Sequence, residues 1–271
     1  MADRTRVCSA GATASVTRAG RGMTLSVAII TRNEQAAIRR CLESVAWADE
    51  IIVLDSASDD GTAAIARELR ARVETTADWP GFGPQKNRAL DLATCEWVLS
   101  LDADEWVSPG LRAAIESAIA APNGKCAFRM PRLSSYCGRF MRHSGWWPDH
   151  VTRLFRRGQA RFSDDRVHEH LIVSGAVGTL SEPLLHEASR DLDEALEKMN
   201  AYSTAGALMQ FERGRKASLA GALWHGAWTF FRTYVLRAGF LDGRAGFLLA
   251  VSNAEGAYYR YLKLMLLAEK R

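Results

Sequence analysis

The sequence lacks the features that define several protein classes. Its five cysteines are odd in number and scattered, with no C-x-x-C spacing, which argues against a disulfide framework and against structural zinc. A reducing cytoplasm is therefore the expected compartment. No stretch approaches the roughly 20 apolar residues that a membrane-spanning helix needs, and no internal repeat is evident. The cysteines are Cys8, Cys41, Cys95, Cys126 and Cys137.

Residues 1–22 also lack the apolar segment of a secretory signal. They carry four arginines among Ala, Gly, Ser and Thr, so we expect a disordered tail, or upstream sequence if translation starts at Met23. Hydrophobic residues make up 48% of the 271-residue chain and charged residues 24%, which is ordinary for a globular protein with a sizeable core.

Short apolar runs alternate with helical patterns in the first 120 residues. The runs 25–30, 51–54 and 97–101 predict buried strands. Apolar residues spaced at i, i+4 and i+7 from Ile38 predict an amphipathic helix between the first two. Such alternation indicates βαβ units, and therefore an α/β fold with a mostly parallel sheet and flanking helices.

The second half of the chain follows a different pattern. Between residues 126 and 186 it indicates short strands and irregular loops. From residue 191 to 211 a helical repeat returns. The expected packing positions of that helix are Leu192, Leu196, Met199 and Leu208.

Two carboxylates, Asp102 and Asp104, end the run at 97–101. Residues i and i+2 of an extended segment point the same way, so both side chains can face one site. In an open α/β sheet that site lies beyond the carboxyl ends of the strands. The D-x-D pair suits a divalent cation that also binds phosphates, since Mg²⁺ takes few protein carboxylates. The alternative is a pair of acids that stabilises the helix predicted from Pro109.

Two cations, Lys86 and Arg88, open a predicted helix just after a Gly/Pro loop. A helix N-terminus flanked by cations suits a diphosphate. Residues i and i+2 of a helix do not share a face, so we expect only one of them, Lys86, to reach the ligand. The alternative is a solvated charge at the start of the helix.

The ordered set of motifs resembles the family 2 glycosyltransferases of the GT-A fold. The resemblance covers Leu25 to Glu105 and rests on VAIITRNE, VLDSASDDGT, QKNRAL and LDADE. Three later motifs, RLFR, VHEHL and GFLDG, are similar to the branch that adds β-linked glucose to the inner-core heptose of bacterial lipopolysaccharide. The resemblance implies a GT-A-like nucleotide-sugar and acceptor-binding catalytic domain over residues 23–190, followed by a helical region over 191–271.

The same resemblance implies an inverting transfer of a sugar, glucose in that branch, from a UDP-sugar to a saccharide acceptor, with Mg²⁺ or Mn²⁺. Asp55 would contact the uracil, because a carboxylate accepts from a base N–H, unless it only caps a turn. Thr31 and Glu34 would line the same pocket, although Glu34 could instead stabilise the N-terminus of the following helix. Asp104 would bind the metal, with Asp102 nearer the ribose.

The catalytic base is expected in VHEHL. Inversion requires a base that takes the proton of the acceptor hydroxyl; Glu169 is the candidate, and Asp164 and Asp165 are its rivals. Either His168 or His170 could complete the metal shell. In an extended segment both histidines would share one face and Glu169 the other, so a bend in the backbone is needed to bring Glu169 and a ligating histidine into one site.

The acceptor site is expected around a pair of tryptophans. Trp146 and Trp147 could supply an aromatic platform for a sugar ring, with Arg153 and Arg156 reaching acceptor phosphates. Two adjacent tryptophans are as often packing anchors.

The C-terminal region combines aromatic residues with positive charge. Residues 217–231 carry no charge, and Trp224, Trp228 and Phe231 recur at i, i+4 and i+7. From Arg213 onward ten Lys or Arg face three Asp or Glu, a net charge of +7 in a chain whose total is +4. This pattern suits a helix lying on an anionic membrane, here the cytoplasmic face of the inner membrane, near a lipid-linked acceptor. The alternative is a core helix with charged ends.

Other functions stay open at this point. The protein could act on another lipid-linked or cell-surface glycan, or bind a nucleotide sugar without turnover. A nucleotidyltransferase is disfavoured because no Gly-rich, Lys-bearing phosphate loop follows the first strand. Nucleic acid is not an expected partner, because the basic residues alternate with bulky apolar ones and no recognition motif is present.

Overall fold

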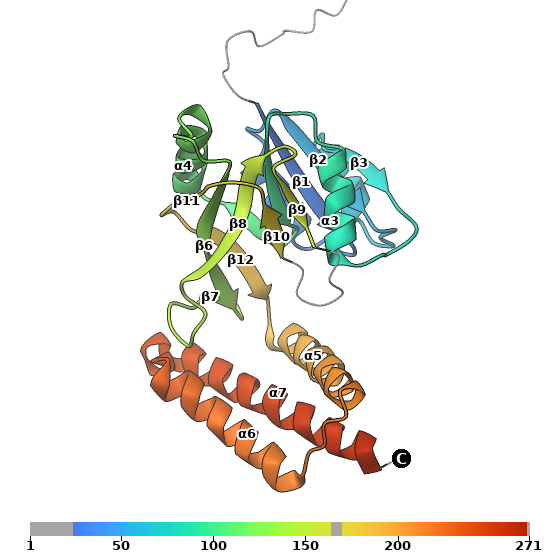
Figure 1. The fold of residues 1–271 in the computed structure, drawn as a ribbon, viewed down its shortest axis with the longest axis vertical. Helices are drawn as coiled ribbons and strands as arrows, with labels where there is room; N and C mark the ends of the chain where they lie inside the picture. The colour runs from blue at the N-terminus through green and yellow to red at the C-terminus, as the bar shows by residue number, and fades with distance from the viewer. Residues whose placement is uncertain (1–23, 164–169, 270–271) are drawn as a thin grey trace, which may run out of the picture.

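The computed structural model describes residues 24–163 and 170–269. The tail predicted over residues 1–22 therefore lies outside the described residues. A sheet domain stands above a layer of long helices (Figure 1), and the strand β12 leads from one into the other. The α/β class with a helical C-terminal extension, expected from the sequence, is confirmed.

The first half of the sheet is parallel, as the alternation of apolar runs predicts. Four strands lie in the order β3-β2-β1-β4. Helices connect them, as βαβ crossovers require. The elements are β1 (Leu25–Thr31), α1 (Ile38–Ser44), β2 (Glu50–Asp55), α2 (Thr62–Glu68), β3 (Arg72–Thr75), α3 (Phe82–Asp91) and β4 (Trp97–Asp102).

The second half of the sheet is mixed. It continues from β4 through the antiparallel strand β8 to β6, β12 and β5, while β7 and β11 also pair with β6. The strands β9 and β10 form a separate antiparallel pair. The bounds are β5 (Glu105–Val107), α4 (Pro109–Ala120), β6 (Ala127–Tyr136), β7 (Arg139–Phe140), β8 (Asp149–Arg156), β9 (Ala160–Phe162), β10 (Leu171–Val173), β11 (Val177–Thr179) and β12 (Leu184–Ser189).

Both faces of the parallel strands β1, β2 and β4 are largely buried, which is why their sequences read as continuous apolar runs. Alternate residues of β1 enter different cores: Val27 and Ile29 pack with α1 and α4 residues, whereas Ala28 and Ile30 pack with α3 residues. Trp97 at the start of β4 is fully buried. The strands are thereby held from both sides, and their carboxyl ends are fixed relative to one another.

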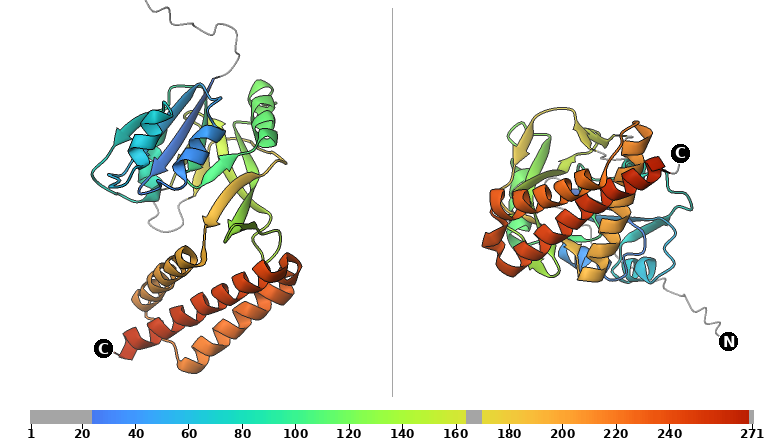
Figure 2. Two further views of the ribbon diagram at one scale, coloured as in Figure 1. Left: turned by 180° about the vertical axis from the view of Figure 1, so that it is seen from behind. Right: turned by 90° about the horizontal axis from the view of Figure 1, so that it is seen from below.

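Three long helices form the layer below the sheet. The helices α6 and α7 lie side by side and α5 packs on α7 (Figure 2). No helix among the described residues is long and apolar enough to cross a bilayer. The bounds are α5 (Leu192–Glu212), α6 (Leu219–Phe231), η1 (Arg232–Leu236), η2 (Gly239–Asp242) and α7 (Gly243–Glu269).

Three of the four packing positions predicted for α5 are wrong, whereas the fourth, Met199, is half-buried and lies against Gly256 of α7. Leu192, Leu196 and Leu208 are exposed, and small residues are buried in their place. The physical reason is that α5 packs closely on α7, where Ala195 shares a core with Leu249. The buried positions of α5 are Ala195, Ser203 and Ala207.

The GFLDG segment ties the helical layer to the sheet domain. The buried Asp242 carboxylate accepts hydrogen bonds from the backbone N–H groups of Arg142 (3.2 Å) and His143 (3.0 Å), and lies 2.9 Å from His143 Nδ1. A Cβ on Gly246 would lie 1.8 Å from the carbonyl oxygen of Gly239, so only glycine permits this contact. The motif therefore fixes the start of α7 against the loop that precedes β8.

Candidate active site

The carboxyl ends of three neighbouring strands carry the polar residues that the sequence predicted there. Thr31 on β1 is paired in register with Asp55 on β2, and Ile30 with Asp102 on β4. Asp55 is only 2% exposed, and its carboxylate accepts hydrogen bonds from the Ser58 backbone N–H (3.0 Å) and hydroxyl (2.5 Å). The edge therefore presents a carboxylate that the loop after β2 holds in place.

The hydroxyl of Thr31, at the carboxyl end of β1, is buried and has no hydrogen-bond partner. Within residues 24–163 and 170–269, the buried side-chain polar atoms that lack a hydrogen bond are Thr31 Oγ1, Arg153 Nε and Arg260 Nε. A buried polar group without a partner costs about 1–3 kcal/mol. Thr31 Oγ1 thus suits a polar group of a ligand bound beyond β1 and β2.

Asp102 is held between two buried cations. Lys86 Nζ lies 3.0 Å from its Oδ1, and the Arg153 guanidinium donates to its Oδ2. Burial alone would raise the pKa of the Asp102 carboxyl, but the charges and hydrogen bonds of Arg153 and Lys86 outweigh it and hold that pKa well below its usual range. Asp102 is therefore a fixed anion. Arg88, in contrast, points away and pairs with Asp78 (2.8 Å).

Glu105 is the fourth member of an ion cluster that also contains Lys86, Asp102 and Arg153. Its side chain is fully buried and lies 2.7 Å from Arg153 Nη2, while its Oε2 accepts the Asp102 backbone N–H at 3.0 Å. Burial would lower the pKa of Arg153, but the two carboxylates raise it above its already high ordinary value. Arg153, expected at the acceptor, thus has its guanidinium on Asp102 and Glu105. This placement favours a role in positioning Asp102.

Asp104 faces a histidine that the sequence did not single out. Asp104 Oδ2 lies 3.4 Å from Nε2 of His186 on β12, and Nδ1 of the same ring lies 2.8 Å from Ser134 Oγ. When Nδ1 donates to Ser134, the lone pair of Nε2 points at a carboxylate oxygen, an arrangement that a bound cation or a proton stabilises.

This pair fits a divalent metal. Two atoms that each lie about 2.1 Å from one Mg²⁺ at octahedral angles are about 3 Å apart, close to the separation of Asp104 Oδ2 and His186 Nε2. No group of three or more His, Cys, Asp or Glu able to hold an ion occurs in the described part of the chain. Phosphate oxygens and water would have to supply the other ligands, as Mg²⁺ prefers.

The VHEHL segment lies mostly outside the described residues. That applies to Glu169 and His168, and to the rival bases Asp164 and Asp165. His170 is described: it is exposed beside β10, and its Nδ1 lies 3.2 Å from Ser163 Oγ. The histidine that faces Asp104 is His186.

Glu34 extends the site on the β1 side. Its backbone N–H donates to Thr62 Oγ1 (2.8 Å), which fixes the loop after β1. Burial, and next the negative charge of Asp104, raise the pKa of Glu34 to about 7. Glu34 therefore titrates near neutral pH in the metal-free protein, unlike an ordinary surface glutamate.

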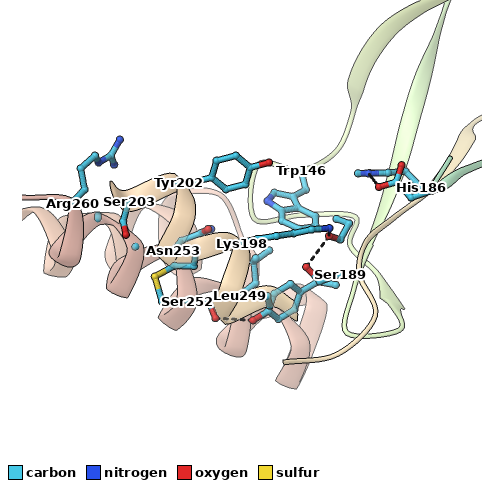
Figure 3. A pocket seen from close by; sticks show the side chains of 17 residues that line it. Trp146, His186, Ser189, Lys198, Tyr202, Ser203, Leu249, Ser252, Asn253 and Arg260 are labelled. Atoms are coloured by element: carbon cyan, nitrogen blue, oxygen red, sulfur yellow. Dashed lines mark hydrogen bonds and ion pairs between the residues drawn. The ribbon is translucent and has the colours of Figure 1, made fainter. Parts of the chain in front are cut away.

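A cavity of about 460 Å³ opens beside Asp104 and His186. Asp104, His186 and Trp146 border it, and it continues between α5 and α7 (Figure 3). Trp146 also packs edge-on against Tyr136, with ring centroids 6.1 Å apart. Trp147 lies instead against the guanidinium of Arg142. Of the two tryptophans, the structure thus brings Trp146 to the cavity beside the predicted metal site.

Several known proteins are similar to this chain. Residues 26–173 match the family model described as Glycosyl transferase family 2. The lipopolysaccharide core biosynthesis glycosyltransferase LpsC of Rhizobium meliloti is 32% identical over 89% of this chain and 91% of its own length. An uncharacterized glycosyltransferase of Rickettsia felis is 31% identical over 90% and 89%. Glucosyl-3-phosphoglycerate synthase of Mycobacterium tuberculosis, crystallised with Mn²⁺ and UDP-glucose, is 26% identical over 42% and 44%, with a TM-score of 0.36.

Replacing Arg153 tests the buried ion cluster. Arg153→Met removes the cation nearest to the fully buried Glu105 side chain, so we expect the free energy of unfolding to fall by about 3–5 kcal/mol in urea titrations at pH 7. Arg156→Met is the matched control on the same strand. Its side chain is 39% exposed and its partner Glu96 44%, so a loss of about 1 kcal/mol or less is expected. Equal losses in the two variants would contradict the cluster's role.

Glu34 predicts a pH dependence of stability. Its pKa is about 7 in the folded protein and near 4.5 when unfolded, so between these values the folded state binds more protons. Stability therefore falls as the pH rises through this window. In urea titrations with EDTA, wild type should lose more stability than Glu34→Gln between pH 5 and pH 7.5. Identical changes in both proteins would show that Glu34 does not titrate in this range.

Proposed function

The chain belongs to glycosyl transferase family 2, and we propose that it is an inverting, metal-dependent hexosyltransferase that moves glucose from UDP-glucose to a lipopolysaccharide core saccharide. One observation carries the proposal: the strand edge with Thr31, Asp55 and Asp102 lies next to an Asp104–His186 pair that opens onto a cavity. A nucleotide at the edge and an acceptor in the cavity would meet at that pair.

The strand edge forms the donor half of the proposed site. Asp55 and Thr31 offer an acceptor and an unpartnered hydroxyl to the uridine, and Asp102 offers its partly exposed carboxylate to the ribose. Lys86, at the same carboxylate, places positive charge near the diphosphate. Asp104 and His186 would hold Mg²⁺ or Mn²⁺, which when bound neutralises negative charge on the departing UDP.

The acceptor half of the proposal uses a base from the VHEHL segment. Glu169 would take the proton from the acceptor hydroxyl as that oxygen attacks the anomeric carbon from the face opposite to UDP, which inverts the configuration. Asp164 and Asp165 remain its rivals. The assignment rests on the family resemblance, and the described residues Ser163 and His170 flank residues 164–169, which contain all three candidates.

The proposed acceptor is a lipid-linked saccharide, because the relative LpsC is named for lipopolysaccharide core biosynthesis. The surface of the helical layer supports this choice. Trp224 is 66% exposed, Leu223 57% and Leu236 59%. The exposed Arg232 and Arg237 are close to them in the chain. Burial of these side chains at an anionic interface would hold the enzyme at the cytoplasmic face of the inner membrane. Other exposed apolar residues of this surface are Leu219, Trp228, Phe231, Phe240 and Leu241.

The metal-ligand pair is tested by UDP binding. In titration calorimetry, wild type should bind UDP more tightly with Mn²⁺ than with EDTA. Asp104→Asn and His186→Ala should each lose about tenfold or more of that Mn²⁺-dependent affinity. Asp91→Asn, an exposed carboxylate on α3, should bind as wild type does. UDP affinity that is independent of Mn²⁺ in wild type, or unchanged in both variants, would contradict the site.

The membrane surface is tested by sedimentation with vesicles. Wild type should bind phosphatidylglycerol vesicles better than phosphatidylcholine vesicles, and less well as salt rises. Trp224→Ser combined with Trp228→Ser should weaken binding about tenfold or more, because two aromatic anchors are lost. The control Ile172→Ser removes an apolar side chain that is 55% exposed on β10, and should not change binding. Equal binding of the double variant and wild type would refute the surface.

A further inference from the structure

The cavity beside the metal-ligand pair has two chemically different ends. Asp104 and His186 border one end, whereas Arg260 of α7 lies at the other (Figure 3). Trp146 and Tyr202 lie between them. Its volume of about 460 Å³ falls within the roughly 300–1,000 Å³ of sites that enclose small ligands. A ligand that reaches from end to end would therefore touch aromatic side chains first and then a cation.

Arg260 is a cation without a counter-ion in the described structure. Its Nε is buried and has no hydrogen-bond partner. No ion pair to it occurs among residues 24–163 and 170–269; its guanidinium carbon lies 5.9 Å from the ring centroid of Tyr261. The Arg260 side chain is half-buried, and a guanidinium is a cation that presents several N–H donors. An anionic group of a ligand would satisfy both its charge and its free N–H.

The other cations near the cavity are already satisfied. Lys198 Nζ lies 2.9 Å from Glu194 and donates to the Ala188 carbonyl (2.8 Å). Lys263 Nζ donates to Ser203 Oγ and to Asn200 Oδ1, both at 2.7 Å. Both ammonium groups therefore have hydrogen-bond partners, whereas Arg260 Nε has none, so the preference for an anion rests on Arg260.

A glycine on α5 makes room for the Arg260 side chain. A Cβ at Gly206 would lie 2.8 Å from Arg260 Cδ, which is closer than two carbon atoms in van der Waals contact. Cδ lies in the middle of the side chain, so a methyl group there would displace the guanidinium from its position. The two helices are thus shaped to hold this arginine where it lies.

The middle of the cavity suits sugar rings. Tyr202 is 74% exposed and Trp146 is half-buried, so both offer aromatic surface to a ligand. Ser252 and Asn253 of α7 line the same stretch and add polar groups. Aromatic faces with a few polar groups between them match a ligand that has apolar C–H faces and hydroxyl edges.

We propose that this cavity binds the acceptor saccharide and that Arg260 selects one with a negatively charged substituent, a phosphate or a carboxylate, away from the hydroxyl that reacts. The acceptor assignment rests on the proposed function, whereas the anion preference rests on Arg260 alone. The reacting hydroxyl would lie at the Asp104–His186 end, and the anion at the α5–α7 end.

The test compares simple sugars as binding probes. Glucose 6-phosphate, glucuronate, glucose and inorganic phosphate are titrated into the full-length protein and followed by saturation-transfer NMR and Trp fluorescence. Wild type should bind at least one anionic sugar about tenfold more tightly than glucose, as expected for a charge-assisted hydrogen bond. Arg260→Gln should lose this preference and Arg260→Lys should keep part of it. Which anionic sugar binds better identifies the substituent as phosphate or carboxylate.

One further variant separates the position of the guanidinium from its charge, and a second serves as a control. Gly206→Ala keeps the charge but displaces Arg260, so it should also reduce the preference. Arg244→Gln removes an exposed arginine from the same helix, outside the cavity, and should leave every affinity unchanged. Thermal melts verify that each variant is folded.

Three results would overturn the proposal: equal binding of glucose and both anionic sugars by wild type, an unchanged preference in Arg260→Gln, or inorganic phosphate binding as tightly as glucose 6-phosphate. UDP and Mn²⁺ are titrated into the same proteins. Arg260→Gln should bind them as wild type does. A wild type that prefers anionic sugars but does not bind UDP would refute the proposed function and leave the anion site standing.

Discussion

A buried ion cluster at the carboxyl edge of the sheet is the constraint on which the rest of the site depends. Asp102, Glu105 and Arg153 come from β4, β5 and β8, and Lys86 comes from α3. Buried charges of this kind are stable only while every partner is present. The cluster therefore fixes the short turn between β4 and β5. Asp104 lies in that turn, and its orientation toward His186 follows from the position of its charged neighbours.

The helical layer is part of the site and not only an appendage to it. Asp242 fixes the start of α7 to the loop before β8, and α5 follows directly from β12, the strand that carries His186. The cavity lies between these elements, so its shape depends on both attachments. The same layer exposes Trp224 and Leu223 on α6. In the proposed function the helices thus serve two purposes: they enclose the acceptor and they present apolar side chains to the membrane that carries it.

Much of the fold could be predicted because local patterns report burial. The apolar runs that form β1, β2 and β4 are buried on both faces. Because these strands are parallel, their carboxyl ends lie at one edge of the sheet, and the position of the side chains there could be predicted from strand direction alone. Helical periodicity predicted that Lys86 and Arg88 would not share a face, and in the structure Lys86 pairs with Asp102 whereas Arg88 pairs with Asp78. The packing face of α5 could not be predicted in this way, because small residues face α7 where two helices approach closely.

The sequence by itself determined the fold class, the family and the edge of the sheet at which Asp55, Asp102 and Asp104 gather, because each of these depends on periodicity or spacing within a short segment. Only the tertiary structure decided which histidine faces Asp104, that Arg153 and Glu105 support Asp102, and that Arg260 lies without a counter-ion at the far end of the cavity. Those contacts join residues far apart in the chain. Their partners are set by how the strands and helices pack, and no local pattern encodes that.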